Sequence, residues 1–442
     1  MNPIRYFDID RSNLDRSEKK VVDALIKAGE VIHDIWQRQV DPETGDLLLY
    51  PQEVEESEIL KAGEKDPELL SPYTVVVREG GGFKAIPYSK AYESDLDRFY
   101  SYLEEAKSAS EDKELKNYLM NIISSYKEND FEKALIHYLE NNSKIEFLCG
   151  PLETYEDKFL GKKRTFQYNL RVLQEKPTED MKSMVEVIKN IHLRQPKSSV
   201  GSGIDPSKIT IRIDEVVMFS GRQSKFLVSS TNLPNEPELV ELYGTKVVVY
   251  TTSMYMKFDE KHLPLLPLVQ GEGLGSSVEQ MKTAMFRGIA LHEIAEGTVK
   301  FKGMADRLGK HIDYVRELNA DLVGIDSAKY YVLNGLLSLQ EYRYLLASFI
   351  IFALDMCNQF RETGELNDYV IGDAILFNRL FESGSLKLYK GRLKIEFTQM
   401  AKDVELLSNL TLRILEEGNE QDAAKLLMQY GDRSIFEKLP RP

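Results

Sequence analysis

Hydrophobic and polar positions follow two patterns along the chain: a helical repeat of three to four residues and a strand-like alternation. The first region follows the helical repeat. Apolar residues recur every three or four positions over 14–39, which predicts an amphipathic helix. Two β-branched runs separated by Gly80-Gly81-Gly82 predict a hairpin over 74–88. Further helical patterns follow near 89–108, 111–126 and 131–142. The region 1–143 is therefore predicted to be mainly helical with one hairpin.

From about residue 144 the pattern shortens to alternation and becomes rich in aromatic and branched side chains, which is typical of strands. A short helical pattern near 178–191 interrupts it. Strand-like segments continue at 208–221, 225–235 and 245–254. We predict that residues 144–255 form a β-rich lobe.

The helical period returns in the last region, 256–442, which is predicted to be a helical lobe with a short hairpin over 386–397. The helices expected there cover 278–300, 311–333, 338–363, 368–382, 397–417 and 419–430. Strand-rich and helix-rich regions that follow one another in this way indicate the α+β fold class.

Composition narrows the classes of function. The 442 residues suffice for two or three domains, and a net charge of −14 argues against nucleic acid or an anionic membrane as partner. The two cysteines, Cys149 and Cys357, lie far apart in the sequence, give no disulfide framework and fit a reducing compartment. The N-terminus has no apolar leader, and no run approaches the roughly 18–20 apolar residues of a membrane span. We therefore expect a cytoplasmic protein.

The candidate chemistry begins with HEIAE at 292–296, inside a predicted helix. On a helix, His292 and Glu296 share a face and Glu293 lies beside them. This is the spacing of the zinc-protease motif H-E-x-x-H, in which positions i and i+4 bind metal and the intervening Glu is the general base. Here a Glu replaces the second His. Such a pattern is more often a solvated face with ion pairs, but the apolar turn before it predicts a buried helix.

A second helical segment, RELNAD at 316–321, supplies the rest of a candidate metal site. A catalytic zinc needs three protein ligands and an open position, and Glu317 is placed to be the third ligand after His292 and Glu296. Asp321, one turn further on, can orient a ligating His from behind.

Three other segments carry a resemblance. In chain order, SPYTVVVREGGGFKAIPYSKAY (71–92), GPLETYEDKFLGKKRTF (150–166) and NLPNEPELVELYGTK (232–246) precede the two metal-site helices. Together they resemble the dipeptidyl peptidase III family of zinc metallopeptidases, particularly its shorter bacterial members. The resemblance covers roughly residue 70 to the C-terminus.

The resemblance implies a two-lobed metal-dependent exopeptidase: a mainly helical lobe with the metal site, a lobe with a β-barrel-like core, and a cleft between them. Such an enzyme releases dipeptides from the N-termini of short peptides, with Glu293 activating a metal-bound water. The family pattern places Glu153, Tyr155, Asn232 and Asn235 on the substrate's free N-terminus. Carboxylate and amide oxygens can accept hydrogen bonds from an α-ammonium group, and burying that charged group without such partners would cost free energy.

The chain also departs from the family. Glu296 replaces the second metal-binding His, Arg316 replaces a Glu, and Ile371 stands where a His helps to stabilise the transition state. His311, between the metal helices, is either a substitute ligand or a plain surface or cap residue.

Two interpretations remain open. If Glu296 ligates, the extra carboxylate neutralises a zinc ion and shifts the preference toward Mn or Fe. If Arg316 instead pairs with Glu296 or Glu293, the metal is lost and the chain is a catalytically degenerate, peptide-binding protein. The oligomeric state is left open by the sequence.

Overall fold

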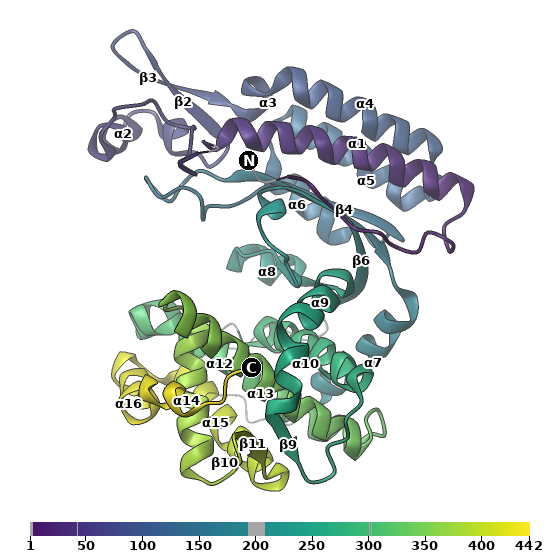
Figure 1. Ribbon diagram of the computed structural model, residues 1–442. Coiled ribbons are helices and arrows are strands. Elements are labelled where there is room, and N and C mark those ends of the chain that lie inside the picture. The colour runs from purple at the N-terminus through teal and green to yellow at the C-terminus, as the bar shows by residue number, and fades with distance from the viewer. Residues whose placement is uncertain (1–2, 42, 193–207, 300, 302) are drawn as a thin grey trace. The chain divides into compact units, whose positions relative to one another are not determined.

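The computed structural model describes residues 3–41, 43–192, 208–299, 301 and 303–442 (Figure 1). The chain forms two compact units. Unit 1 consists of Met1–Gln174 and Asp214–Val228, and unit 2 of Glu175–Ile213 and Ser229–Pro442. Unit 2 is mainly helical and carries both predicted metal-site helices, so the expected α+β class with two lobes is confirmed. The division into 1–143, 144–255 and 256–442 stays a prediction.

The helices of unit 1 are those that the apolar periodicity predicted, with two short additions. They are α1 (Arg16–Gln39), α2 (Glu56–Gly63), α3 (Tyr88–Ala91), α4 (Glu93–Ala109), α5 (Lys113–Lys127) and α6 (Phe131–Glu140). A capping box starts α1: Glu18 N–H donates to the Asp15 carboxylate at 2.8 Å, and Asp15 N–H donates to Glu18 at 2.8 Å. The apolar stripe of α1 is buried against α4 and strand β5.

The strands form a hairpin and a larger sheet. The hairpin pairs β2 (Thr74–Glu79) with β3 (Gly82–Pro87), as predicted. The sheet contains β1 (Arg5–Tyr6), β4 (Ile145–Glu153), β5 (Thr165–Leu173), β6 (Ile209–Gly221), β7 (Ser230–Leu233) and β8 (Thr245–Tyr250). Their order is β4-β5-β6-β8-β7, with β1 beside β6.

The expectation of a barrel-like core needs correction. Closure would require the first and last strands of this order to pair, and among the described residues β4 and β7 do not. The sheet of the described strands is therefore open, and it ends at β7, which is 4 residues long.

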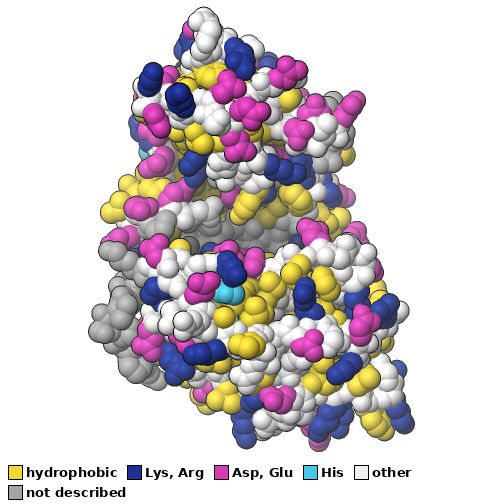
Figure 2. Space-filling view, turned by 90° about the vertical axis from the view of Figure 1, so that its left-hand side faces the viewer, with side chains coloured by type: hydrophobic (Ala, Val, Ile, Leu, Met, Phe, Trp, Pro, Cys, Tyr) yellow, Lys and Arg dark blue, Asp and Glu magenta, His cyan; other side chains and the backbone are white. Residues whose placement is uncertain are grey.

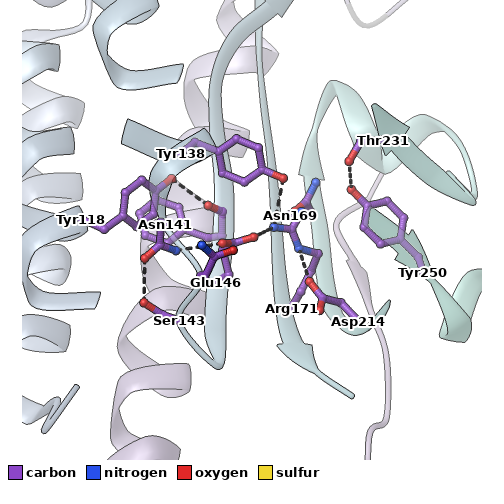
Figure 3. A network of polar contacts seen from close by, with 12 residues as sticks. Tyr118, Tyr138, Asn141, Ser143, Glu146, Asn169, Arg171, Asp214, Thr231 and Tyr250 are labelled. Atoms are coloured by element: carbon purple, nitrogen blue, oxygen red, sulfur yellow. Dashed lines mark hydrogen bonds and ion pairs between the residues drawn. The ribbon is translucent and has the colours of Figure 1, made fainter. Parts of the chain in front are cut away.

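A fully buried ionic network lies in unit 1 (Figure 3). Arg171 on β5 is 0% exposed, and its Nε lies 3.2 Å from Asp214 Oδ2 while a terminal nitrogen pairs with Glu146. Asn141 Nδ2 donates to the other carboxylate oxygen of Glu146, Oε1, at 2.9 Å, and Asn169 Oδ1 accepts from Arg171 at 2.8 Å. Because the charged groups come from β4, β5 and β6, they tie three strands together, and losing one would leave a buried charge uncompensated.

Unit 2 is a helical bundle around one large apolar core, which draws on α10, α12, α13, α14 and α15. Its helices are α7 (Glu175–His192), α8 (Pro237–Tyr243), α9 (Thr251–Lys257), α10 (Val278–Thr298), α11 (Met304–Leu308), α12 (Ile312–Leu333), α13 (Leu339–Thr363), α14 (Asp368–Glu382), α15 (Phe397–Glu417) and α16 (Glu420–Tyr430). Strands β10 (Leu386–Tyr389) and β11 (Arg392–Ile395) form the predicted hairpin, and β9 (Val269–Gly271) joins it in parallel. Every helix predicted after residue 278 is confirmed.

Short 3-10 turns lie at Pro67–Leu70, Arg222–Lys225, Leu263–Leu268, Gly309–His311 and Arg433–Lys438, and a π turn covers Phe258–His262. Within the described ranges, no helix has the length and apolar character needed to cross a membrane. On the face shown in Figure 2, acidic and basic side chains are interspersed over both units.

Candidate metal centre

A glycine brings the two candidate metal helices together. A Cβ atom at Gly324 on α12 would lie 2.9 Å from the carbonyl carbon of Leu291 and 3.0 Å from the backbone nitrogen of His292 on α10. Only the missing side chain permits this backbone approach. Asp321 and Glu317 lie about one and two turns before Gly324. The close crossing therefore places them opposite the HEIAE segment.

His292 lies between two carboxylates of α12. The residue is 8% exposed, with Nδ1 at 2.7 Å from Asp321 Oδ1 and Nε2 at 3.5 Å from Glu317 Oε2. Burial favours the neutral ring, but the charges and hydrogen bonds of Asp321 and Glu317 outweigh it and hold the pKa of His292 well above its ordinary value. A His whose Nδ1–H is held by a carboxylate presents Nε2 as its ligating atom, and here Nε2 faces Glu317.

Glu317 is surrounded by donors. Arg316 NH2 donates to its Oε1 at 3.3 Å, and Tyr369 of α14 hydrogen-bonds it while the Tyr369 ring lies 6.2 Å from that of His292. Burial alone would raise the pKa of Glu317, but its bonds to His292, Arg316 and Tyr369 lower that pKa to about 2. Glu317 is therefore an ionised carboxylate directed at the His292 ring.

Glu293 faces a different element, the edge strand β7. Ser230 Oγ donates to Glu293 Oε1 at 2.5 Å. Burial, together with the nearby Glu296 carboxylate, raises the pKa of Glu293 to about 7, against the opposing effect of His292. A carboxylate whose pKa lies near neutrality is matched to general-base work, because it both accepts and releases a proton at working pH.

Glu296 does not join His292 and Glu317. Its Oε1 lies 3.7 Å from Arg316 Nε, and Asn232 Nδ2 donates to its Oε2 at 3.4 Å. Within the described ranges, no group of three or more His, Cys, Asp or Glu side chains is arranged to hold a metal ion. Two of the three predicted ligands therefore converge, and the third is turned toward a cation and an amide.

The predicted substrate residues lie in different units. Asn232 is on β7 beside Glu293 and Glu296, with Thr245 hydrogen-bonded to its amide oxygen, and Asn235 follows β7 as an exposed residue. Glu153 ends β4 in unit 1, and Tyr155 is 72% exposed, with the Arg222 guanidinium 4.8 Å from its ring centroid. The structure thus groups Asn232 with the HEIAE helix and Glu153 with Tyr155.

Within the described residues, His311 contacts side chains other than the candidate ligands. Its Nε2 lies 3.9 Å from Glu420 Oε1, and its ring packs edge-on against Tyr314 at 5.7 Å. His311 also occupies the N-cap position of α12. Its side chain makes no capping hydrogen bond there, so this placement favours a plain surface or terminal residue over a substitute ligand.

Sequence reasoning missed two residues of this centre, Ser230 and Tyr369. A signal for Ser230 was present, because it lies two positions before Asn232 and alternate residues of a strand share a face. Nothing in the sequence singled out Tyr369, which reaches Glu317 only through the packing of α14 on α12.

Comparison with known proteins supports the fold. No protein-family model matches the chain. A curated relative, Nudix hydrolase 3 of Arabidopsis thaliana, is 26% identical over 356 residues, which are 78% of this chain and 45% of that protein. The chain thus spans less than half the length of this relative.

Two solved structures are similar over nearly the whole chain. Dipeptidyl peptidase III from Caldithrix abyssi superposes with a TM-score of 0.83 at 22% identity, covering 98% of this chain and 95% of that one. Dipeptidyl-peptidase III from Corallococcus sp. strain EGB gives a TM-score of 0.75 at 18% identity, covering 98% and 92%. The chain therefore has the fold of the dipeptidyl peptidase III structures.

Proposed function

We propose that this protein is a metal-dependent exopeptidase that releases dipeptides from the N-termini of short peptides. The observation that carries the proposal is the half-buried Glu293, which Ser230 holds by Oε1 and whose pKa is about 7, beside a His292 that Asp321 holds by Nδ1. These groups lie in a chain with the dipeptidyl peptidase III fold, whose solved examples are named as peptidases.

In the proposed reaction, Glu293 takes a proton from a water molecule as the water oxygen attacks the scissile carbonyl carbon. The carboxyl then gives that proton to the leaving nitrogen as the carbon–nitrogen bond breaks. Ser230 fixes the orientation of the Glu293 carboxylate by donating to Oε1. Glu153, Tyr155, Asn232 and Asn235 would bind the free amine and the first residues of the peptide.

The proposed ligands are His292, Glu296 and Glu317, for one zinc ion or, given the two carboxylates, Mn or Fe. When bound, such a metal supplies a Lewis acid for the scissile carbonyl. Binding requires Glu296 to exchange its contacts with Arg316 and Asn232 for the metal. We also propose a cytoplasmic location, because Cys149 and Cys357 are both free thiols buried in the protein.

One contact favours a second candidate function, a non-catalytic peptide-binding protein. Arg316 lies within 3.7 Å of Glu296 and 3.3 Å of Glu317, so a protein cation already faces both carboxylate ligands. In this alternative, peptides with a free N-terminus bind without being cleaved.

Elemental analysis of purified protein, after incubation with zinc, manganese or iron, separates the two functions. The exopeptidase proposal expects about one metal per chain, lost in Glu296→Ala and in Glu317→Ala. It also expects hydrolysis of dipeptidyl arylamides that Glu293→Gln abolishes. Wild-type protein that takes up no metal and cleaves no arylamide, yet binds short peptides, would establish the binding function instead.

A further inference from the structure

Arg222 stands out in unit 1 as a guanidinium without a polar partner. In the part of the chain that the structure describes, it makes no hydrogen bond or ion pair, and its Nε is buried and unsatisfied. Its contacts are with two aromatic rings: the guanidinium carbon lies 4.8 Å from the Tyr155 centroid and 5.6 Å from that of Phe226. Both rings are largely exposed, Tyr155 by 72% and Phe226 by 51%.

The turn that carries Arg222 is rigidly held. Gly221 precedes it with φ +59°, and a Cβ there would lie 2.5 Å from the carbonyl oxygen of Phe166. The next two residues are buried: Asn169 Nδ2 donates to Gln223 Oε1 at 2.7 Å, and Ser224 Oγ donates to the Gly221 carbonyl at 2.8 Å. The backbone on both sides of Arg222 is thus anchored, and its side chain is preorganised against Tyr155.

The charged residues Lys225 and Glu156, which lie nearby, pair with each other and not with Arg222. Lys225, three residues on, is already paired with Glu156 Oε1 at 2.5 Å, and Glu156 also accepts from Trp36 Nε1 at 3.1 Å. Contact with aromatic rings leaves the N–H donors of a half-buried guanidinium available to an anion. A carboxylate fits this planar fork of donors, because its two oxygens can accept two parallel hydrogen bonds. Flanking rings favour such a pair, because they cover the guanidinium planes without competing for its N–H groups.

We propose that Arg222 is a specificity-determining residue that binds the side-chain carboxylate of an acidic residue at one of the first two positions of the peptide. The inference rests on the proposed function, in which Tyr155 and Glu153 receive the peptide's N-terminus. Since the guanidinium stacks on Tyr155, a carboxylate bound to Arg222 would belong to a residue close to the free amine.

The test is isothermal titration calorimetry on the full chain carrying Glu293→Gln, which keeps peptides intact. The probes are two matched pairs: Glu-Ala-Ala-Ala against Gln-Ala-Ala-Ala, and Ala-Glu-Ala-Ala against Ala-Gln-Ala-Ala. We expect the Glu member of at least one pair to bind about tenfold more tightly, as one charge-assisted contact provides. Arg222→Met should abolish that preference while the Gln peptides bind as before.

Three further variants sharpen the result. Arg222→Lys keeps the positive charge but not the planar fork of donors, and it should retain part of the preference. Arg222→Glu should reverse the preference, so that the Gln peptides bind more tightly than the Glu peptides. Arg78→Met removes another guanidinium stacked on an aromatic ring, that of Phe83 at 5.2 Å, and should leave the preference unchanged. Equal binding within both pairs, or a preference that survives Arg222→Met, would overturn this inference alone. Failure of all four peptides to bind would overturn the proposed function as well.

Discussion

Asp321 Oδ1 lies 2.7 Å from Nδ1 of His292, across the crossing of α12 and α10. In the neutral ring this contact keeps the proton on Nδ1, and it turns Nε2 toward Glu317. A carboxylate behind a histidine is the arrangement that makes the ring a better and better-oriented metal ligand. The helix crossing therefore places the Glu317 carboxylate beside His292 and also orients the His292 imidazole through Asp321.

Replacing Asp321 by Asn should weaken metal binding, because an amide that presents an N–H to Nδ1 favours the tautomer protonated on Nε2. We expect zinc affinity to fall about 10–100-fold, measured by competition with a chromophoric chelator. Asp326→Asn is the matched control, since Asp326 lies on the same helix but pairs with Lys329 at 2.9 Å. Equal zinc affinities for the two variants would contradict a role for Asp321 in orienting His292.

The helix crossing itself can be tested at Gly324. In Gly324→Ala the new methyl would meet the Leu291 backbone at 2.9 Å, so the helices must move apart. We expect the free energy of unfolding to fall by about 1–3 kcal/mol and zinc affinity to fall with it. Denaturant unfolding and chelator competition provide the two measurements.

Gly288→Ala on α10 is the matched control for that variant. A Cβ at Gly288 would have its nearest neighbour at 3.7 Å, an ordinary contact, and alanine is the better helix former by up to about 1 kcal/mol. Gly288→Ala should therefore be neutral or stabilising. A loss of stability as large as that of Gly324→Ala would show that the close helix approach is not the cause.

Much of this architecture could be predicted from periodicity, and the failures have physical causes. The helices α10, α12, α13, α14 and α15 match their predicted ranges within two residues, because each is a long segment rich in apolar residues without an internal proline. The strand predicted over 245–254 ends at Tyr250, where α9 begins. Thr251 and Thr252 extend the β-branched pattern, so the local sequence did not mark the change.

The sequence predicts which site residues share a face of one helix, but it does not predict which residues of other elements they contact. Spacing alone places His292 and Glu296 on one face, but their partners come from other elements. The sequence left open whether Arg316 meets Glu296 or Glu293, and in the structure it lies near Glu296 and Glu317. Sheet closure was equally undecidable, because strand alternation does not say whether β4 and β7 pair.

Arg316 should compete with the metal for the two carboxylates. Arg316→Met removes a cation that lies 3.7 Å from Glu296 and 3.3 Å from Glu317. We expect zinc affinity to rise at least about tenfold, and the metal-free protein to melt at a lower temperature because Glu293, Glu296 and Glu317 then repel one another.

Thermal melting with and without zinc measures both effects of that substitution. Arg287→Met is the control, because it removes a cation of unit 2 that pairs with Glu341 at 2.7 Å instead. A zinc affinity that falls in Arg316→Met would mean that Arg316 supports the metal site, and competition would be excluded.

The loop that presents Tyr155 should be sensitive to acid through Asp157. This carboxylate accepts backbone N–H groups of Leu160 at 3.0 Å and Lys163 at 2.7 Å, and the Tyr50 hydroxyl at 2.8 Å. Burial opposes ionisation, but these hydrogen bonds prevail and lower the pKa of Asp157 below its ordinary value of 3.8. The stabilisation is therefore complete above the unfolded-state pKa and is lost as pH falls through the folded-state pKa.

Asp157→Asn should accordingly cost about 2–4 kcal/mol of unfolding free energy at pH 7, because an amide nitrogen would face backbone donors. The difference between wild type and variant should shrink as pH falls from about 5 toward 2, since the wild-type carboxylate is then protonated. Urea unfolding at several pH values measures this convergence. Asp46→Asn, at an exposed position, should track wild type throughout. A stability difference that stays constant with pH would show that the charge of Asp157 does not hold the loop, and that only its shape matters.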